Sequence, residues 1–148
     1  MRILVVLATF LLSITGCSDA RYLGPFELDE RSFDADALAM VQQDTGIVLP
    51  KGARGLHFRY KPPVDPAFIA KLEIPASARE EMINKIEAIK KQDIGRRADS
   101  LWAGVSWWPP AAAGAIAETR GLRDGNDVWL VLSEENERLV LSIEFVVW

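Results

Sequence analysis

The sequence predicts an α+β domain, in which an antiparallel sheet of about five strands carries two helices packed on one face. Apolar and polar residues alternate over 55–61 and again over 68–74, a pattern typical of strands with one solvated side. Apolar residues recur at helical spacing over 82–89, and β-branched and aromatic residues dominate much of 115–148. The resulting order of helix, two strands, helix and three-strand meander is typical of an α+β sandwich.

The first helix is expected to begin at Asp34, because a carboxylate at the N-cap position accepts a free backbone N–H. Phe33 and Leu38 then occupy the two positions of a hydrophobic staple. Leu38 and Val41, with Met40 as a further candidate, predict the buried side of this helix. Gly46 predicts its end, since glycine readily adopts the left-handed conformation that closes many helices.

Two strands of one hairpin are expected next. The prolines within 62–66 predict a stiff turn between them. The second strand repeats the alternation of the first over 68–74 and ends at Pro75. In the first strand, the apolar side holds Leu56, Phe58 and Tyr60, and the polar side holds His57, Arg59 and Lys61.

The second helix is predicted to begin with a capping box over 77–80. There the Ser77 hydroxyl and the Glu80 carboxylate would each bind a free backbone N–H. Glu81 and Lys85 lie four residues apart and predict a favourable ion pair on the helix surface. The buried stripe of this helix is expected to consist of Met82, Ile83, Ile86 and Ile89.

A meander of three strands is expected near the C-terminus. Residues 128–132 and 138–148 form the two stronger strand candidates, separated by residues 133–137, and 115–122 forms a weaker one. Asp124-Gly125 is a turn signal between the first and second of these strands.

The N-terminus has the layout of an export signal. Arg2 supplies one positive charge, and the uncharged apolar block that follows is shorter than the ~20 residues of a membrane-spanning helix. The block ends at Cys17, the only cysteine of the chain, so no disulfide can form within the chain. Two alternatives remain open, namely an ordinary secretory signal with a chance cysteine and a membrane-embedded N-terminus.

Ile14-Thr15-Gly16-Cys17 resembles the lipobox of bacterial lipoproteins. The resemblance implies cleavage by signal peptidase II between Gly16 and Cys17, a diacylglyceryl group on the Cys17 thiol, and acylation of the new amino group. A membrane, bound through these acyl chains, is therefore an expected partner. In bacteria that sort lipoproteins by the next residue, Ser18 implies the outer membrane, facing the periplasm, whereas an aspartate would favour the inner membrane.

Three parts of the chain are expected. Residues 1–16 form the signal, residues 17–31 the lipidated N-terminus and a tether, and residues 32–148 one globular domain. The tether is polar and contains Gly24-Pro25, without a helical or strand period. A second reading stays open, in which part of it docks on the domain through Tyr22, Leu23, Phe26 and Leu28.

The residues with reactive side chains are few. The net charge of −4 and the scattered Lys and Arg residues give no basic stripe for a nucleic acid. His57, the only histidine, is expected on a polar strand face beside two cations, as an ordinary exposed residue. No cofactor motif, metal cluster or catalytic residue is assigned, and we expect no enzymatic activity. Paired carboxylates such as Glu80/Glu81 do not by themselves support hydrolysis.

The segment from Trp102 to Pro110 is the candidate binding region. The prolines at 109 and 110 favour an extended backbone, in which Trp107 and Trp108 point in different directions, so that one enters the core and the other covers a surface. A structural role, sealing the edge of the helix–sheet core, and a role as an aromatic platform for a partner are both open. Arg96 and Arg97 would then steer an acidic partner.

Residues 45–53, 60–66 and 107–110, together with the lipobox, look like those of small bacterial envelope lipoproteins of uncharacterised function. The expected function is a membrane-tethered, non-enzymatic periplasmic binding module, with an envelope protein or a secreted toxin as its partner. An accessory lipoprotein of an envelope complex and a small cell-wall hydrolase are the alternatives.

Overall fold

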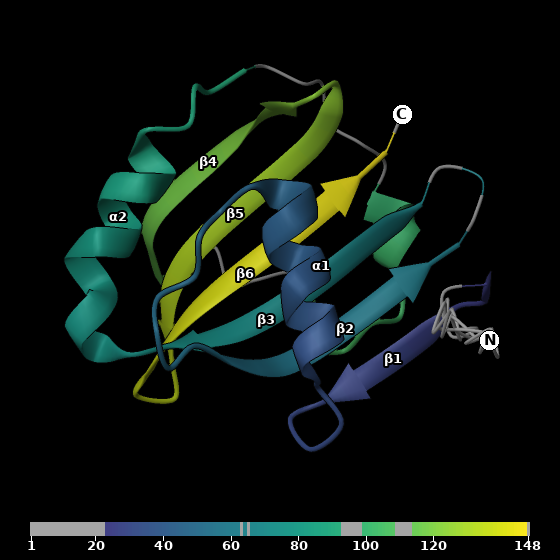
Figure 1. The fold of residues 1–148 in the computed structure, drawn as a ribbon, viewed down its shortest axis with the longest axis horizontal. Coiled ribbons are helices and arrows are strands. Elements are labelled where there is room, and N and C mark those ends of the chain that lie inside the picture. Colours follow the sequence, from purple (N-terminus) through teal and green to yellow (C-terminus); the bar gives the residue numbers. More distant parts are fainter. Residues whose placement is uncertain (1–22, 63, 65, 93–98, 109–113, 148) are drawn as a thin grey trace, which may run out of the picture.

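The computed structural model describes residues 23–62, 64, 66–92, 99–108 and 114–147. Six strands in these ranges form one antiparallel sheet in the order β1-β2-β3-β6-β5-β4 (Figure 1). The strands are β1 Phe26–Asp29, β2 Arg54–Lys61, β3 Ala67–Ile74, β4 Ala115–Arg123, β5 Asn126–Glu135 and β6 Arg138–Val146. The helices are α1 Ala35–Thr45 and α2 Arg79–Glu87, with short 3-10 turns at η2 Ala76–Ala78 and η3 Asp99–Trp102.

The α+β class is confirmed, with six strands in place of about five. The additional strand is β1, which pairs with β2 from Phe26 opposite Tyr60 to Asp29 opposite His57. In β1, the ring centroid of Phe26 lies 5.6 Å from that of Phe58, and Leu28 is buried. Residues 26–29 are therefore docked on the domain, the second of the two readings for 17–31. A four-residue strand is too short to produce a clear alternation.

The predicted ends of α1 are confirmed. Asp34 Oδ1 accepts the N–H of Ala37 at 3.0 Å, and Gly46 has φ 66° with its N–H bound to the carbonyl of Gln42 at 2.9 Å. The centre of the buried side is Ala37 and Val41, both without exposed surface. Leu38 is only half-buried, at the edge of the apolar cluster.

The predicted capping box is wrong. The chain turns through η2 directly after Pro75, and α2 begins at Arg79. Neither η2 nor α2 has a side-chain hydrogen bond at its start. Backbone groups take over the role of the cap, since Ala78 donates its N–H to the carbonyl of Pro75 at 2.9 Å. The predicted stripe is confirmed, with Met82 and Ile86 fully buried, and Glu81 pairs with Lys85 as expected.

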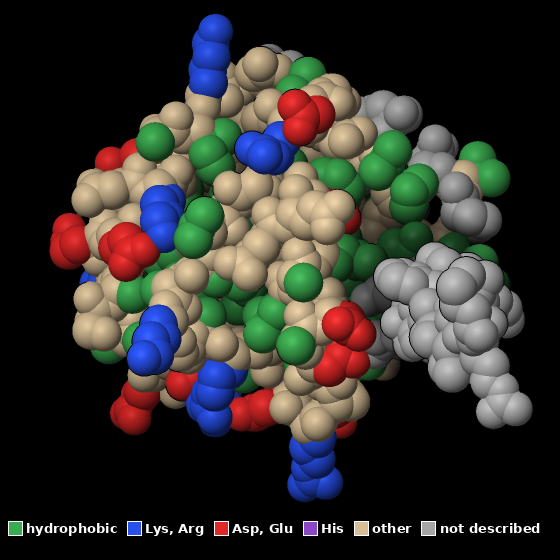
Figure 2. Space-filling model, in the orientation of Figure 1, with side chains coloured by type: hydrophobic (Ala, Val, Ile, Leu, Met, Phe, Trp, Pro, Cys, Tyr) green, Lys and Arg blue, Asp and Glu red, His purple; other side chains and the backbone are tan. Residues whose placement is uncertain are grey.

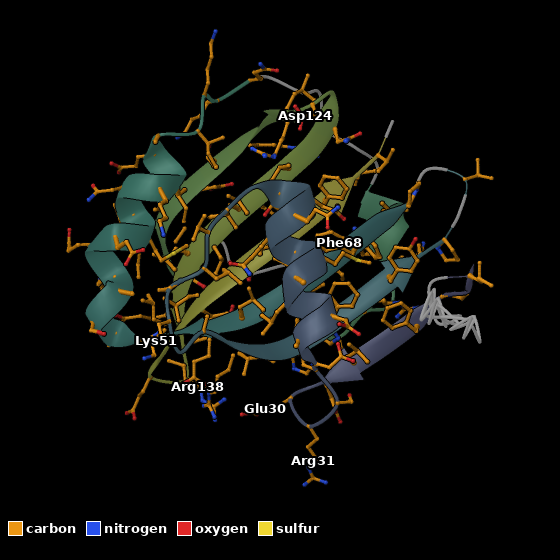
Figure 3. All side chains as sticks on the ribbon, viewed as in Figure 1. Glu30, Arg31, Lys51, Phe68, Asp124 and Arg138 are labelled. Atoms are coloured by element: carbon orange, nitrogen blue, oxygen red, sulfur yellow. The ribbon has the colours of Figure 1, made fainter. Side chains whose placement is uncertain are left out.

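The main core lies between the sheet and both helices, on what we call the helix side. Three rings from adjacent strands stack across it, with Phe68 5.3 Å from Phe58 and 5.3 Å from Phe145. Figure 3 shows Phe68 under α1, and side chains of α1 and α2 belong to the same apolar cluster. Each fully buried ring of this kind stabilises the fold by about 1.5–3 kcal/mol.

The C-terminal meander is confirmed, with β4 and β5 longer than predicted and β6 ending at Val146, two residues before the predicted end. Asp124 and Gly125 have φ 51° and 84° between β4 and β5, as the Asp-Gly signal indicates. Asn136 and Glu137 have φ 51° and 65° between β5 and β6. Two positive φ angles in succession are typical of tight hairpins, so the strands continue to within two residues of each other.

The outer surface of the helix side is mixed in character. Figure 2 shows hydrophobic side chains interspersed with Lys, Arg, Asp and Glu over this face. Neither helix in the described part of the chain is long and apolar enough to cross a membrane.

Candidate functional site

The sheet is also covered on the side opposite α1 and α2, which we call the tryptophan side. Alternation in β3 directs Ala67, Ile69 and Lys71 to this side, while Phe68 and Ala70 face the helices. The segment 101–108 lies over these residues. A second apolar cluster results, formed by Ala67, Ile69, Trp102, Val105 and Val146, with Leu101, Trp107 and Trp108 packed against it.

Trp102 fastens this segment to the sheet. Its ring is 6% exposed, and its indole N–H donates to the carboxylate of Glu144 on β6 at 2.9 Å. Lys61 at the end of β2 donates its ammonium to the carbonyl of Leu101, and the same ammonium lies 5.4 Å from the Trp102 ring centroid. Trp102 is therefore a structural anchor, which is the first of the two roles left open for the segment.

Trp107 joins the segment to β1 and β2. Its indole N–H donates to Glu27 Oε1 at 2.9 Å, and its ring stacks on His57 with centroids 5.0 Å apart and planes 15° apart. Arg59, next on the same side of β2, pairs with Glu27 at 3.6 Å. The ring of Trp107 is half-buried and held from two strands at once.

Trp108 lies between Trp107 and Trp129, so that the three rings form a row that extends to β5. Its ring meets Trp107 at 6.2 Å and 86°, and Trp129 of β5 at 5.7 Å and 89°. Trp129 donates its indole N–H to Glu118 of β4 at 2.8 Å, and the guanidinium of Arg120 lies 6.0 Å from its ring. Trp107, Trp108 and Trp129 are all half-buried, and we call these three rings the tryptophan cluster.

Arg120 is itself fixed in place by Asp127, a carboxylate only 2% exposed. The two side chains share hydrogen bonds of 3.2 and 2.6 Å. The hydrogen bond to Asp127 raises the pKa of the Arg120 guanidinium, so this group keeps its charge beside Trp129. The cluster therefore ends at a fixed cation.

The structure differs from the expectation that Trp107 and Trp108 would separate. Neither ring enters the core between helices and sheet, and both lie on the tryptophan side as edge-to-face neighbours. The physical reason is a turn, since the N–H of Trp108 bonds to the carbonyl of Val105 at 3.1 Å. An extended backbone would have sent the two rings to opposite sides.

Several residues of the site were missed at the sequence level. Trp129 could have been found, because it occupies a polar-side position within an otherwise apolar strand. Glu27 and Glu118 carried no such signal, since ordinary exposed glutamates are common on strands. Of the predicted residues, Gly16, Cys17, Arg96 and Arg97 lie outside the described part of the chain, as do Pro109 and Pro110.

A partly buried ion pair lies elsewhere on the tryptophan side. Lys71 on β3 reaches both carboxylate oxygens of Glu135 on β5, at 2.8 and 2.6 Å. Opposite Lys71 on β6 lies Ser142, whose hydroxyl is the one buried side-chain oxygen or nitrogen among the described residues without a hydrogen-bond partner. The pair ties two strands across β6, at a desolvation cost that offsets much of its attraction.

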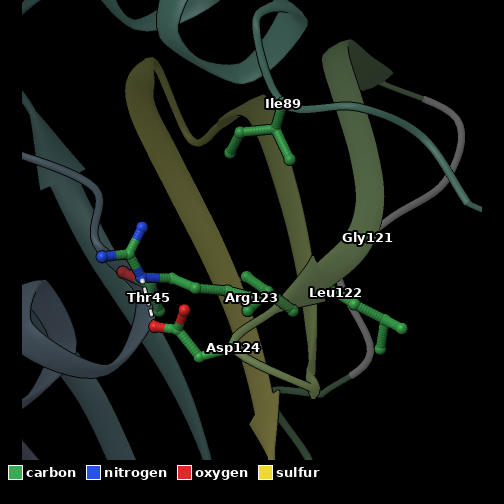
Figure 4. Close-up of a pocket in the computed structure, with 7 residues that line it drawn as sticks. Thr45, Ile89, Gly121, Leu122, Arg123 and Asp124 are labelled. Carbon is green, nitrogen blue, oxygen red and sulfur yellow. Dashed lines mark ion pairs between the residues drawn. The ribbon is translucent and has the colours of Figure 1, made fainter.

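A pocket of about 270 Å³ opens on a different part of the surface, beside β4 and the end of α1 (Figure 4). Arg123 lies directly against Gly46, where a Cβ atom would meet its Cζ at 1.9 Å. A cation at this place favours the C-terminal end of α1. The Thr45 hydroxyl donates to Val41 and accepts from Ile47. Thr45 and Arg123 in this pocket thus stabilise the end of α1, and the tryptophan cluster is the stronger candidate site.

Comparison with known proteins adds nothing to this geometry. Neither a family model, nor a curated protein, nor a solved structure matches the chain. Among the described residues, no three His, Cys, Asp or Glu side chains are grouped so that they could hold a metal ion. The function must therefore be argued from the tryptophan cluster and from the N-terminal motif.

Proposed function

We propose that this protein is a lipid-anchored, non-enzymatic binding module of the bacterial envelope. Acyl chains on Cys17 hold it at the outer membrane, facing the periplasm, and the tryptophan cluster contacts a protein partner. The observation that carries the binding role is the row of three half-buried indole rings held in fixed orientations on one side of the sheet.

Fixed aromatic rings suit protein recognition. Tryptophan offers a large apolar area and is enriched among the residues that dominate binding energy. Because Glu27 and His57 hold Trp107 and Glu118 holds Trp129, little further ordering is needed when a partner arrives. Charged side chains border the rings, which matches the polar rim of typical interfaces.

The binding role is tested by Trp108→Ala in the lipidated protein, with Val48→Ala as the matched control. Trp108 is placed by ring contacts on both sides, whereas Val48 is a 67% exposed side chain on the loop after α1. A partner is first captured from envelope extract and purified, and its affinity for each variant is then measured by calorimetry. We expect a loss of about tenfold or more for Trp108→Ala, as for a binding hot spot, and none for Val48→Ala.

Thermal unfolding of both variants accompanies the binding measurement. A variant Trp108→Phe, which keeps an aromatic ring, separates loss of the contact from loss of the fold. Equal affinity for the wild type, Trp108→Ala and Trp129→Ala would contradict the binding role of the cluster.

The anchor is tested by Cys17→Ala in a bacterium grown with radioactive palmitate. The wild type should incorporate label and show the mass of an N-terminal cysteine that carries a diacylglyceryl group on sulfur and an acyl chain on nitrogen, and the variant should show neither. An unlabelled wild type whose mature chain begins elsewhere would contradict the lipid anchor.

A further inference from the structure

The two ends of the sheet differ in chemistry. At one end, β1 begins, β2 ends, β3 begins and β6 ends, as the partners Phe26–Tyr60, Lys61–Ala67 and Ala67–Val146 show. We call this the proximal end, because the chain enters the sheet there. At the opposite, distal end, β1 ends and β6 begins. Figure 3 shows Glu30, Arg31, Lys51 and Arg138 gathered at the distal end, with Asp124 far from them.

The proximal end presents exposed aliphatic side chains. Leu23, just before β1, is 81% exposed, and Val64, just after β2, is 84% exposed. They are the two most exposed large hydrophobic side chains of the described residues. Both lie beyond the same end of the β1–β2 pair, where β1 begins and β2 ends. The charge at the end of β2 is engaged, since Lys61 bonds to the carbonyl of Leu101. Arg123 and Asp124 also lie at this end, in the β4–β5 turn at the opposite edge of the sheet, and they pair with each other at 3.9 Å. The transfer of such exposed aliphatic side chains from water into a membrane interface is favourable.

The distal end carries a network of ion pairs. Arg138 pairs with Glu73 at 3.4 Å and with Glu30 at 3.6 Å, and Arg54 pairs with Glu73 at 2.8 Å. The two arginines are well exposed, with 60% of the Arg54 side chain and 45% of the Arg138 side chain accessible, while Glu73 between them is 25% accessible. A surface of this kind is strongly hydrated and has nothing to gain from an apolar environment.

The connection to Cys17 is short. Leu23 follows Cys17 by six residues, so that their Cα atoms lie within about 20 Å of each other in any conformation. The sheet is longer than this reach, because the ten residues of β5 span about 34 Å at strand geometry. An anchored domain cannot stand on its distal end, since Leu23 would then be held too far from the bilayer.

We infer that the proximal end is a membrane-docking surface that rests on a phospholipid bilayer, with Leu23 and Val64 in the interface. This inference rests on the lipid anchor of the proposed function. The acyl chains supply the affinity, and the two aliphatic side chains set the orientation. The distal ion pairs then point away from the membrane. The tryptophan cluster lies in the proximal half of the sheet, since Trp129 is the fourth of the ten residues of β5, and it faces sideways where a periplasmic partner reaches it.

The test measures the depth of two positions in the lipidated full-length protein. Because the Cys17 sulfur is blocked by lipid, Val64→Cys and Arg31→Cys each introduce a unique reactive thiol for a fluorophore. The proteins are reconstituted in vesicles of phosphatidylethanolamine and phosphatidylglycerol that contain a lipid-borne quencher. We expect quenching at position 64 and none above background at position 31. Leu23→Ser should reduce the quenching at position 64, whereas Val48→Ser should leave it unchanged.

Failure of the orientation and failure of the anchor give different results. Vesicle flotation and the mass of the N-terminal peptide are recorded first, and a protein that neither floats nor carries lipid fails as a lipoprotein. A floating, lipidated protein with equal quenching at both positions tumbles freely or lies flat, which overturns the orientation alone. Absence of quenching at both positions also overturns it, because the domain is then held off the bilayer.

Discussion

The two sides of the sheet are stabilised in different ways, although the same strands build both. On the helix side, Phe58, Phe68 and Phe145 stack in a core of apolar side chains. On the tryptophan side, the rings are positioned by directed hydrogen bonds, such as those from Trp102 to Glu144 and from Trp107 to Glu27. Burial of apolar area is non-directional and supplies most of the stability, whereas hydrogen bonds add less and fix orientation.

The largest loss of stability is expected for Phe68→Ala on the helix side. The ring is 1% exposed and stacks between two others, so its loss should lower the free energy of unfolding by about 3–5 kcal/mol. Urea denaturation measures this change. A cost no greater than that of the tryptophan-side substitutions below would show that the two sides do not differ as described.

A smaller effect is expected for Trp102→Phe, which keeps a ring but removes the hydrogen bond to Glu144, a carboxylate 8% exposed. The expected loss is about 1–3 kcal/mol of unfolding free energy, because a buried charged acceptor loses a donor. Adding Glu144→Gln to Trp102→Phe should recover part of the loss, as a neutral amide costs less to bury. If the two substitutions were simply additive in a double-mutant cycle, the hydrogen bond would not couple these residues.

A still smaller effect on stability is expected for Trp107→Phe. Its hydrogen bond to Glu27 is exposed to water, so the loss should be about 0.5–1 kcal/mol. The ring loses its fixed orientation, however, and the affinity for a partner should fall more than the stability does. Glu27→Gln is the matched control, because an amide oxygen still accepts the indole N–H. A Glu27→Gln variant that binds as poorly as Trp107→Phe would contradict this account.

The smallest effect is an increase in stability, which we expect for Asp44→Asn in the last turn of α1. Burial raises the pKa of Asp44 above its ordinary value of 3.8, so its ionised form is less favourable in the folded chain than in the unfolded one. Stability is therefore lost as the pH rises from the unfolded pKa through the folded one, and remains lower above it. A negative charge at a helix C-terminus is also unfavourable.

Melting temperatures at neutral pH and at a pH below 3.8 measure this gain. Asp44→Asn should melt higher than the wild type at neutral pH, by a margin that shrinks in acid. Asp36→Asn, at the favourable N-terminal end of the same helix, should melt lower and serves as the control. Equal shifts of both variants would exclude the helix-end effect.

Predictions from sequence succeeded where the signal was local. The ends of α1 follow from Asp34 and Gly46 and from backbone groups three or four residues away. The capping box failed because Pro75, immediately upstream, turned the chain through η2 before the helix began. The strand β1 was left open because four residues carry too little pattern, and its docking depends on pairing with a strand some thirty residues later.

The sequence by itself determined the α+β class, the alternation that assigns side chains to the two sides of the sheet and the hairpin turn at Asp124-Gly125, and it indicated the tryptophan segment as the candidate site. Only the tertiary structure decided which partners hold the rings. Trp102 meets Glu144 across 42 positions of the chain, and Trp107 meets Glu27 across 80. Such contacts depend on strand order and register, which arise when the whole sheet assembles and which no short window of sequence encodes.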